Sequence, residues 1–278
     1  MSLVTTDWLE KNINKVKILD ASWHMPNTKR NGYKEYQKEH IKNSIFFDID
    51  EFSNKETDLP HMLPSEEKWE KIVSNLGISN QDRIIVYDNS DVISSCRCWY
   101  TFIFFGHKPN LVSILNGGFL KWKKENREIT NKISNNAKKM YKAKKVSNLV
   151  KSKYEIDNNI TKKKFKVIDA RNKNRFLGLE KEPRENTRSG AIKNSYCLPF
   201  VEVINSEDKT FIEKKLIKKK FERIGIKNEN NVVFSCGSGI TATVLSLAYS
   251  IINDKYLPTI YDGSWAEYGK LKKNEKIN

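Results

Sequence analysis

Short β-branched and aliphatic runs alternate along this chain with longer stretches whose composition favours helix. Runs such as 17–20 and 232–234 predict strands, whereas 65–75 and 213–224 predict helices. This alternation predicts α/β domains, each with a mainly parallel central sheet flanked by helices. In such sheets ligands bind at the carboxyl ends of strands, so we expect functional residues directly after predicted strands.

The pattern occurs twice, with a period of roughly 148 residues. Four blocks recur in the same order: 17–22 as 166–171, 40–44 as 191–195, 76–88 as 224–236, and 115–122 as 261–268. A period this long indicates duplicated domains rather than a solenoid. We therefore predict two tandem domains, 1–125 and 160–278, joined by a lysine- and asparagine-rich linker at 126–159.

The net charge of +16 arises mostly from lysines scattered among asparagines. No stripe of aromatic and basic residues accompanies this charge, which favours solvated surfaces over a nucleic-acid partner. The longest strongly apolar run, 99–105, is far shorter than the roughly 20 residues that cross a bilayer. No secretory signal is visible, and four cysteines do not make a disulfide framework in a chain of this size. We expect a cytoplasmic protein without membrane or nucleic-acid partners.

A cysteine opens the loop of a predicted strand–loop–helix segment, Cys236–Ala242, between a strand at 232–234 and a helix at 243–251. Gly237 and Gly239 let the backbone curl so that several N–H groups point inward. The helix start adds partial positive charge and unpaired donors. A thiol there should ionise easily, and the thiolate is the nucleophile. We expect a solvent-reachable, ionised sulfur in a cradle that also holds an anionic substrate.

An ordinary cysteine at a strand end is more often a packing residue, but the glycine spacing here favours a reactive one. In the first copy, Asp88–Asp91 occupies the place of Cys236 and the residues after it. Its acidic and amide side chains are unsuited to an anion cradle. The second copy is therefore predicted to be reactive, and the first to contribute walls of the cleft.

The other three cysteines carry no recognisable chemistry. Cys96 and Cys98 lack the two-residue separation of a metal-binding pair, and no second Cys/His pair stands at ligand spacing. We interpret both as small packing residues and Cys197 as a core residue. No metal site is expected.

Several motifs together resemble the rhodanese superfamily, specifically its tandem-domain sulfurtransferases, in which only the C-terminal domain carries the cysteine. They are the loop Cys-Gly-Ser-Gly-Ile-Thr-Ala and the segments 48–50, 61–64, 169–171, 182–184 and 261–265. The loop resembles the 3-mercaptopyruvate sulfurtransferase branch, since the thiosulfate-using branch typically has Arg-Lys in place of Gly237-Ser238. The resemblance extends from about residue 8 to 271. It departs from the family's turns at 40–43 and 191–194, away from the expected reactive centre.

The resemblance implies a sulfur transfer in two halves. The Cys236 thiolate takes sulfur from 3-mercaptopyruvate, a small anionic donor, and releases pyruvate. The resulting persulfide passes its outer sulfur to a thioredoxin-like protein, a small thiol or cyanide. This thiolate-on-sulfur exchange needs no metal or organic cofactor.

The resemblance also assigns substrate-binding residues. Arginine suits a carboxylate because its planar fork binds both oxygens. The implied set comprises the arginines Arg175 and Arg184, the loop residues Gly237, Gly239, Ile240 and Thr241, and Arg97 from the first domain. Arg171 is interpreted as structural, tying a strand end to a nearby carboxylate.

A serine–histidine–aspartate relay beside the cysteine is implied at Ser238, His61 and Asp50, where it would polarise the substrate or move a proton. From spacing alone, His61 is equally a loop histidine between prolines and Asp50 a helix cap.

Three other functions are alternatives to 3-mercaptopyruvate sulfur transfer. A cysteine phosphatase needs an arginine six positions after the cysteine, where this chain has Ala242. Thiosulfate sulfurtransferase is the nearer alternative, although Gly237 and Ser238 offer no cation for a second negative charge. A non-catalytic persulfide carrier would hold sulfur on Cys236 without forming pyruvate.

Overall fold

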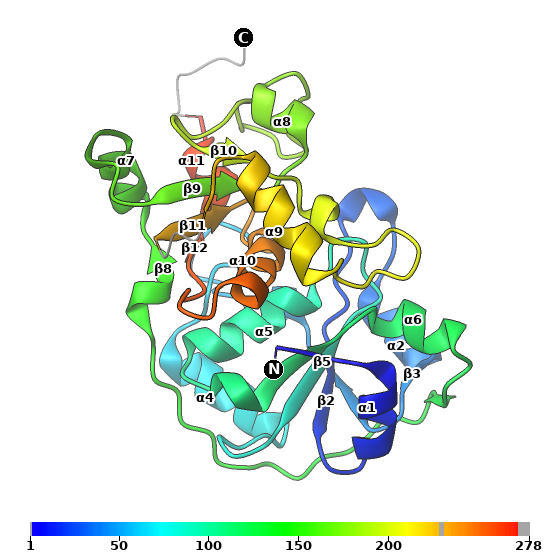
Figure 1. Ribbon diagram of the computed structural model, residues 1–278. Helices are drawn as coiled ribbons and strands as arrows, with labels where there is room; N and C mark the ends of the chain where they lie inside the picture. Colours follow the sequence, from blue (N-terminus) through cyan, green and yellow to red (C-terminus); the bar gives the residue numbers. More distant parts are fainter. Residues whose placement is uncertain (1, 228–230, 272–278) are drawn as a thin grey trace. The chain divides into compact units, whose positions relative to one another are not determined.

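The computed structural model describes residues 2–227 and 231–271. These residues form two compact units (Figure 1). Unit 1 comprises the chain up to Asn54, Leu63–Ser147 and Asn205–Phe211. Unit 2 comprises Lys55–Met62, Asn148–Ile204 and the described chain from Ile212 onward. Each unit thus includes one short segment that belongs, by sequence position, to the other half of the chain.

Among the described residues, unit 1 contains a five-stranded sheet in the order β1-β6-β5-β2-β4, with every neighbouring pair parallel. Its strands are β1 (Leu3–Val4), β2 (Lys17–Asp20), β4 (Ser44–Phe46), β5 (Ile84–Tyr87) and β6 (Val112–Leu115). Its helices are α1 (Thr6–Asn12), η1 (Pro26–Thr28), α2 (Gly32–Lys38), α3 (Ile49–Phe52), α4 (Glu66–Asn75), α5 (Ser95–Phe104), η2 (Pro109–Leu111) and α6 (Gly118–Lys124). A separate antiparallel pair joins β3 (His40–Ile41) and β7 (Ile129–Thr130).

Unit 2 repeats this arrangement within its described residues, in the order β8-β12-β11-β9-β10, again all parallel. Its strands are β8 (Val150–Lys151), β9 (Lys166–Asp169), β10 (Tyr196–Cys197), β11 (Val232–Ser235) and β12 (Ile260–Tyr261). Its helices are α7 (Lys153–Lys162), α8 (Lys173–Leu177), η4 (Phe200–Val203), α9 (Lys214–Arg223), α10 (Thr241–Ile252) and α11 (Ser264–Tyr268), and η3 (Ser147–Leu149) precedes β8. The predicted duplication and the α/β fold class are confirmed.

The segment 126–159, predicted as a linker, contains β7, η3, β8 and the first two turns of α7. Across the described ranges, no helix combines the length and apolar character needed to traverse a bilayer.

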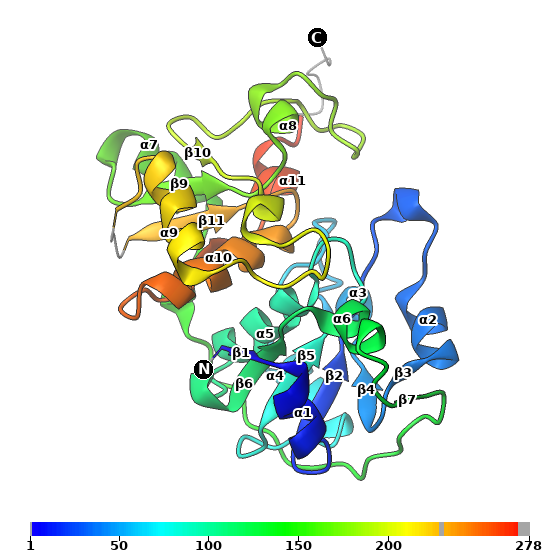
Figure 2. The ribbon, with the colours of Figure 1, turned by 45° about the vertical axis from the view of Figure 1, so that its right-hand side comes forward.

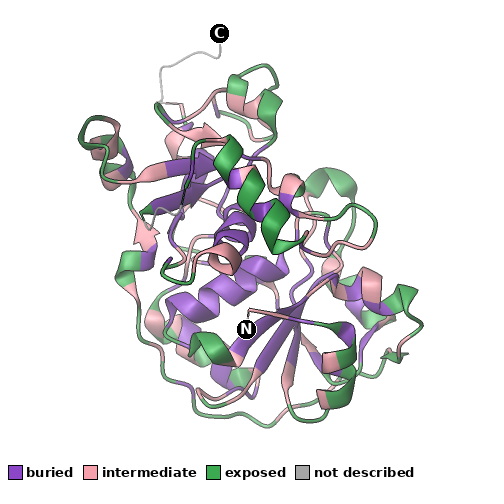
Figure 3. Ribbon diagram, viewed as in Figure 1, coloured by how far each residue is buried: buried purple, intermediate pink, exposed green. Residues whose placement is uncertain are grey.

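Both faces of the unit 2 sheet are covered, which explains why the central strand β11 is buried along its whole length. On one face Val233 packs with residues of α7 and α11. On the other, Phe234 meets Phe221 of α9 and Tyr249 of α10, with ring centroids 6.0 and 6.1 Å apart. Figure 2 shows α9 and α10 side by side. The central strands are buried, whereas α9 presents an exposed, lysine-rich outer side (Figure 3). This packing fixes the end of β11, where Cys236 follows.

The two units differ in the partners of the buried carboxylate at the end of β2 in unit 1 and of β9 in unit 2. In unit 2, Asp169 pairs with Arg171 at 2.7 Å. In unit 1, Asp20 is 3% exposed and accepts hydrogen bonds from the amide and hydroxyl of Ser22, at 2.9 and 2.5 Å. Burial raises the pKa of Asp20 to about 7, despite the hydrogen bonds from Ser22.

We expect Asp20→Asn to flatten the dependence of thermal stability on pH. Because the folded-state pKa is raised, the folded protein holds an extra proton between about pH 4 and pH 7 and loses stability as pH rises through this window. Asparagine keeps an acceptor for Ser22 without a buried charge. Melting curves at about pH 5 and pH 8 should show a smaller decline for the variant than for the wild type. An equal decline would contradict the buried, titrating carboxylate.

Candidate active site

Cys236 stands at the carboxyl end of β11, and α10 begins five residues later at Thr241. The loop between them turns at Gly239, whose φ of +80° lies in the left-handed region that favours glycine. This turn aims the Gly239 N–H at Cys236, with 3.1 Å between the nitrogen and Sγ. The loop therefore donates a backbone hydrogen bond to the sulfur, which stabilises negative charge there.

The start of α11 holds the other side of this loop. The Trp265 amide donates to the Cys236 carbonyl and the Ala266 amide to the Gly237 carbonyl, both at 2.9 Å. The Cys236 amide donates to Ser264 Oγ at 3.1 Å. These three bonds hold the loop against the start of α11.

The expectation of a solvent-reachable sulfur is wrong for this conformation, since Cys236 is 2% exposed. Its contacts are nevertheless polar, because the Gly239 amide and, at 4.0 Å, the Ser264 hydroxyl face Sγ. The sulfur is therefore buried, with the Gly239 amide as its hydrogen-bond donor.

Two arginines approach the loop at Gly237. A Cβ at this position would lie 3.3 Å from Nη2 of Arg175 and 3.5 Å from Nη1 of Arg184. Both guanidinium groups therefore lie close to the backbone of the residue that follows Cys236. Burial lowers the pKa of Arg184, and the positive charge of Arg175 lowers this pKa further. The Cys236 side chain acts in the opposite direction and raises it.

The buried carboxylate of Glu182 fixes Arg175. Its oxygens accept from Nε and Nη2 of Arg175 at 3.1 and 2.5 Å and from Nη1 of Arg171 at 2.6 Å. The Glu182 side chain is only 2% exposed. Arg171 also binds Asp169 and lies 4.4 Å from the Trp265 ring, so its structural interpretation is confirmed. We did not predict a role for Glu182. The sequence feature that could have indicated one is an acidic residue two positions before Arg184.

Ser238 connects an arginine to a histidine. Its Oγ lies 3.0 Å from Nη2 of Arg184 and 3.0 Å from Nδ1 of His61. Arginine can only donate, so the hydroxyl accepts from Arg184 and has its own proton to offer to His61. His61 has a φ of +60° and is 6% exposed, in the segment Lys55–Met62 of unit 2.

Asp50 and Arg97 belong to unit 1. Asp50 lies on α3, where its Oδ2 accepts from Nε1 of Trp23 at 2.9 Å. Arg97 lies on α5 and is 3% exposed. Their roles beside Cys236 stay predictions, whereas Cys236, Ser238, His61 and the two arginines all lie in unit 2.

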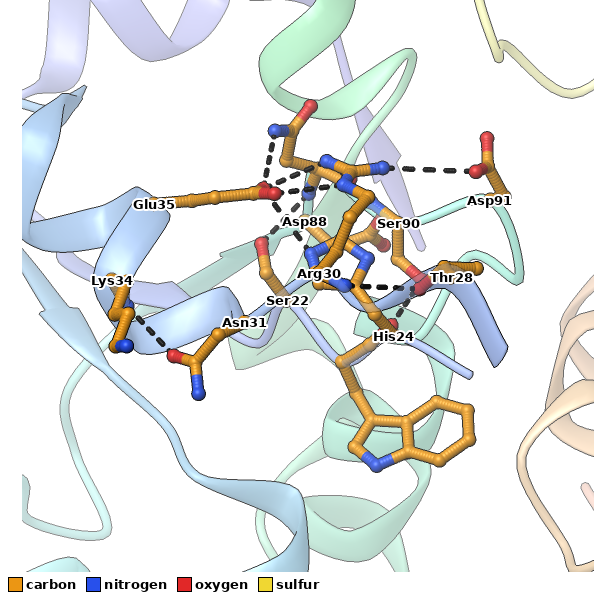
Figure 4. Close-up of polar contacts among 12 residues, drawn as sticks. Ser22, His24, Thr28, Arg30, Asn31, Lys34, Glu35, Asp88, Ser90 and Asp91 are labelled. Carbon is orange, nitrogen blue, oxygen red and sulfur yellow. Dashed lines mark hydrogen bonds and ion pairs between the residues drawn. The ribbon is translucent and has the colours of Figure 1, made fainter. Parts of the chain in front are cut away.

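The matching loop of unit 1 carries its own anion. The Asp88 carboxylate accepts from the amides of Ser90 and Ser95, both at 2.8 Å. Nearby, Glu35 accepts from Arg30 at 2.7 Å and contacts His24 at 3.2 Å (Figure 4). Two loop amides that could serve an external anion are thus already bound to the Asp88 carboxylate.

The remaining cysteines are poor nucleophiles. Cys96 and Cys98 are fully buried as predicted, and burial raises their thiol pKa well above its usual range. Cys197 is half-buried rather than a core residue, and burial raises its pKa to about 11. Within the described ranges, no group of histidine, cysteine and carboxylate side chains could hold a metal ion.

Comparison with known proteins places this geometry in a family. The Rhodanese-like domain matches residues 5–125 and 152–271. The chain is 37% identical to thiosulfate/3-mercaptopyruvate sulfurtransferase 1, mitochondrial, of Arabidopsis thaliana, over 96% of the chain and 75% of the relative. It is 32% identical to 3-mercaptopyruvate sulfurtransferase of Mus musculus, over 99% of the chain and 94% of the relative. SseA of Escherichia coli, a 3-mercaptopyruvate sulfotransferase of known structure, matches with a TM-score of 0.85 at 28% identity, covering 95% of this chain and 99% of its own.

The chain therefore belongs to the rhodanese-like family and contains two copies of its domain. Within the family it is a tandem-domain sulfurtransferase of the branch that includes the 3-mercaptopyruvate sulfurtransferases.

The arginines should make Cys236 selective for anionic reagents. We expect the ratio of alkylation rates for iodoacetate over iodoacetamide to be higher at Cys236 than at Cys197. In Arg184→Gln this ratio should fall about 10-fold at Cys236, because a nearby positive charge attracts the carboxylate of iodoacetate. Peptide mass spectrometry gives both rates, with the exposed Lys181→Gln as control. An unchanged ratio in Arg184→Gln would mean that its charge does not reach the sulfur.

Proposed function

We propose that this sulfurtransferase moves sulfur from 3-mercaptopyruvate to a thiol or cyanide through a persulfide on Cys236, with release of pyruvate. The observation that carries the proposal is the approach of Arg175 and Arg184 to Gly237, directly beside the nucleophile. Glu182 takes one edge of Arg175, and Ser238 accepts one hydrogen of Arg184, so the remaining guanidinium hydrogens would serve a carboxylate. The carboxylate of the donor would bind there.

The charges of this cluster suit a donor with one negative charge. Asp169 and Glu182 balance two of the three guanidinium groups of Arg171, Arg175 and Arg184. One positive charge remains for the substrate or the thiolate. 3-Mercaptopyruvate carries one carboxylate, whereas thiosulfate is a dianion that calls for a further cation.

In the first half of the cycle, the Cys236 thiolate attacks the sulfur of 3-mercaptopyruvate. A sulfur–sulfur bond forms and the carbon–sulfur bond breaks, with its electron pair leaving on carbon as the enolate of pyruvate. The thiol proton of the donor is transferred to that carbon, which gives pyruvate and an anionic persulfide. The Gly239 amide, already 3.1 Å from Sγ, supports negative charge on the sulfur pair.

We propose that Ser238 and His61 carry this proton, with Asp50 as the third member. The 3.0 Å contacts of Ser238 with Arg184 and His61 support the first two assignments. Arg97 is proposed to contact the donor from unit 1, and the Gly239–Thr241 backbone to hold the developing anion.

In the second half, an acceptor thiolate or cyanide attacks the outer sulfur and regenerates the Cys236 thiolate. This exchange needs no cofactor. A thioredoxin-like dithiol or a small thiol is the proposed acceptor. All four cysteines are free, which supports a compartment that keeps thiols reduced, and we propose the cytoplasm.

Thiosulfate is the second candidate donor, because the name of the Arabidopsis relative includes both donors. We expect a higher kcat/KM with 3-mercaptopyruvate than with thiosulfate when both are assayed with cyanide. Cys236→Ser should abolish thiocyanate formation with either donor, and with it the release of pyruvate from 3-mercaptopyruvate. A preference for thiosulfate would reverse the donor assignment, and pyruvate release by Cys236→Ser would exclude the persulfide route. A wild type that binds sulfur without releasing pyruvate would be a carrier.

The ion pair with Glu182 positions Arg175 for the donor. We expect Glu182→Gln to raise the KM for 3-mercaptopyruvate about 10-fold or more with a smaller change in kcat, because the neutral amide no longer fixes the guanidinium. The exposed Glu185→Gln is the matched control and should keep both constants. Steady-state pyruvate formation measures this effect. Equal losses in kcat and kcat/KM would instead mean that Glu182 contributes to stabilising the transition state rather than to binding the donor.

A further inference from the structure

A cavity of unit 2 lies at the opposite ends of the strands from Cys236. It has a volume of about 610 Å³. Val232 and Val233, the first residues of β11, line it, whereas Cys236 follows the last residue of the same strand. The cavity therefore takes no part in the proposed sulfur transfer.

Part of the cavity wall is apolar and remains partly open to solvent. Phe165, Val232, Val233 and Leu257 contribute to it, with Tyr154 alongside. Leu257 is 55% exposed and Tyr154 is 76% exposed. The side chain of Asn159 holds the Phe165 backbone through two hydrogen bonds, at 2.8 and 3.0 Å. Exposed apolar residues grouped at one concave place mark a binding site.

Four lysines line the same cavity, and three of them have no anionic partner there. Lys151 pairs with Glu155 at 2.7 Å. For Lys162, Lys164 and Lys255, the described part of the chain offers no carboxylate within ion-pair distance. Among the residues that the structure describes, the cavity therefore combines apolar surface with three lysines that have no ion-pair partner.

The corresponding corner of unit 1 lacks this combination. The cavity there is lined mainly by polar residues, among them Lys17, Asp82 and Arg83. Asp82 binds Lys139 at 2.9 Å, and Arg83 lies 4.5 Å from the ring of Trp8. The feature has thus arisen in one copy of a duplicated fold and is not a consequence of the fold itself.

We propose that this cavity of unit 2 binds a small amphiphilic anion. A flat apolar group would lie against Phe165 and Leu257, and a carboxylate, phosphate or sulfonate would be held by Lys162, Lys164 and Lys255. The volume lies within the range of sites for small organic ligands. Opposite charge and a preformed apolar surface together define this class of ligand.

The probe for this site is 8-anilinonaphthalene-1-sulfonate, whose fluorescence rises on an apolar surface. Titration of the full-length Cys236→Ser protein should show one saturable site that neither 3-mercaptopyruvate nor pyruvate displaces. This separates the cavity from the proposed active site, so failure of one hypothesis leaves the other standing.

Two variants test the chemistry of recognition. Replacing Lys162, Lys164 and Lys255 together by Gln should weaken probe binding about 10-fold, and Leu257→Asp should weaken it at least as much. The matched control replaces the exposed lysines Lys214, Lys215 and Lys219 of α9 by Gln and should bind like the parent. Uncharged N-phenyl-1-naphthylamine should discriminate little between the lysine variant and the parent. Unchanged sulfonate binding in the lysine variant, or no saturable binding by the parent, would overturn the proposal.

Discussion

One buried carboxylate, that of Glu182, determines how positive charge is arranged in unit 2. It accepts from both Arg171 and Arg175 while its side chain is 2% exposed. A carboxylate buried this deeply requires cationic partners, and it holds those partners in turn. Arg171 is thereby committed to structure, and Arg175 is presented beside the loop that carries Cys236. The proposed substrate site depends on this arrangement.

The two units show how little change separates a reactive copy of the fold from one whose anion cradle is filled. Their sheets have the same strand order and parallel pairing. In the loop after β11, Cys236 accepts one amide hydrogen bond. In the matching loop after β5, Asp88 takes its place and accepts two. The arginine at 171 corresponds to Ser22, so Asp20 is buried without the ion pair that Asp169 makes. The differences lie in side chains at strand ends, where parallel sheets present their functional groups.

The sequence predicted the fold well because its signals are local and repeated. Matched runs predicted β2 with β9 and β5 with β11, and glycine spacing predicted the turn before α10. The burial of Cys236 could not be predicted, because burial is a tertiary property that no local pattern of residues encodes. The Glu182 cluster was missed for the same reason: an acid that binds two arginines through space leaves no periodic signal. His61 is a different case, since the resemblance placed it near Ser238 before the 3.0 Å contact was seen.

The central claim is that Cys236 carries sulfur as a persulfide. Mass spectrometry of the wild-type protein, treated with 3-mercaptopyruvate in the absence of an acceptor, tests this most directly. We expect a gain of one sulfur atom on the peptide that contains Cys236, lost again on addition of dithiothreitol. No added sulfur, or sulfur found on Cys197 instead, would contradict it.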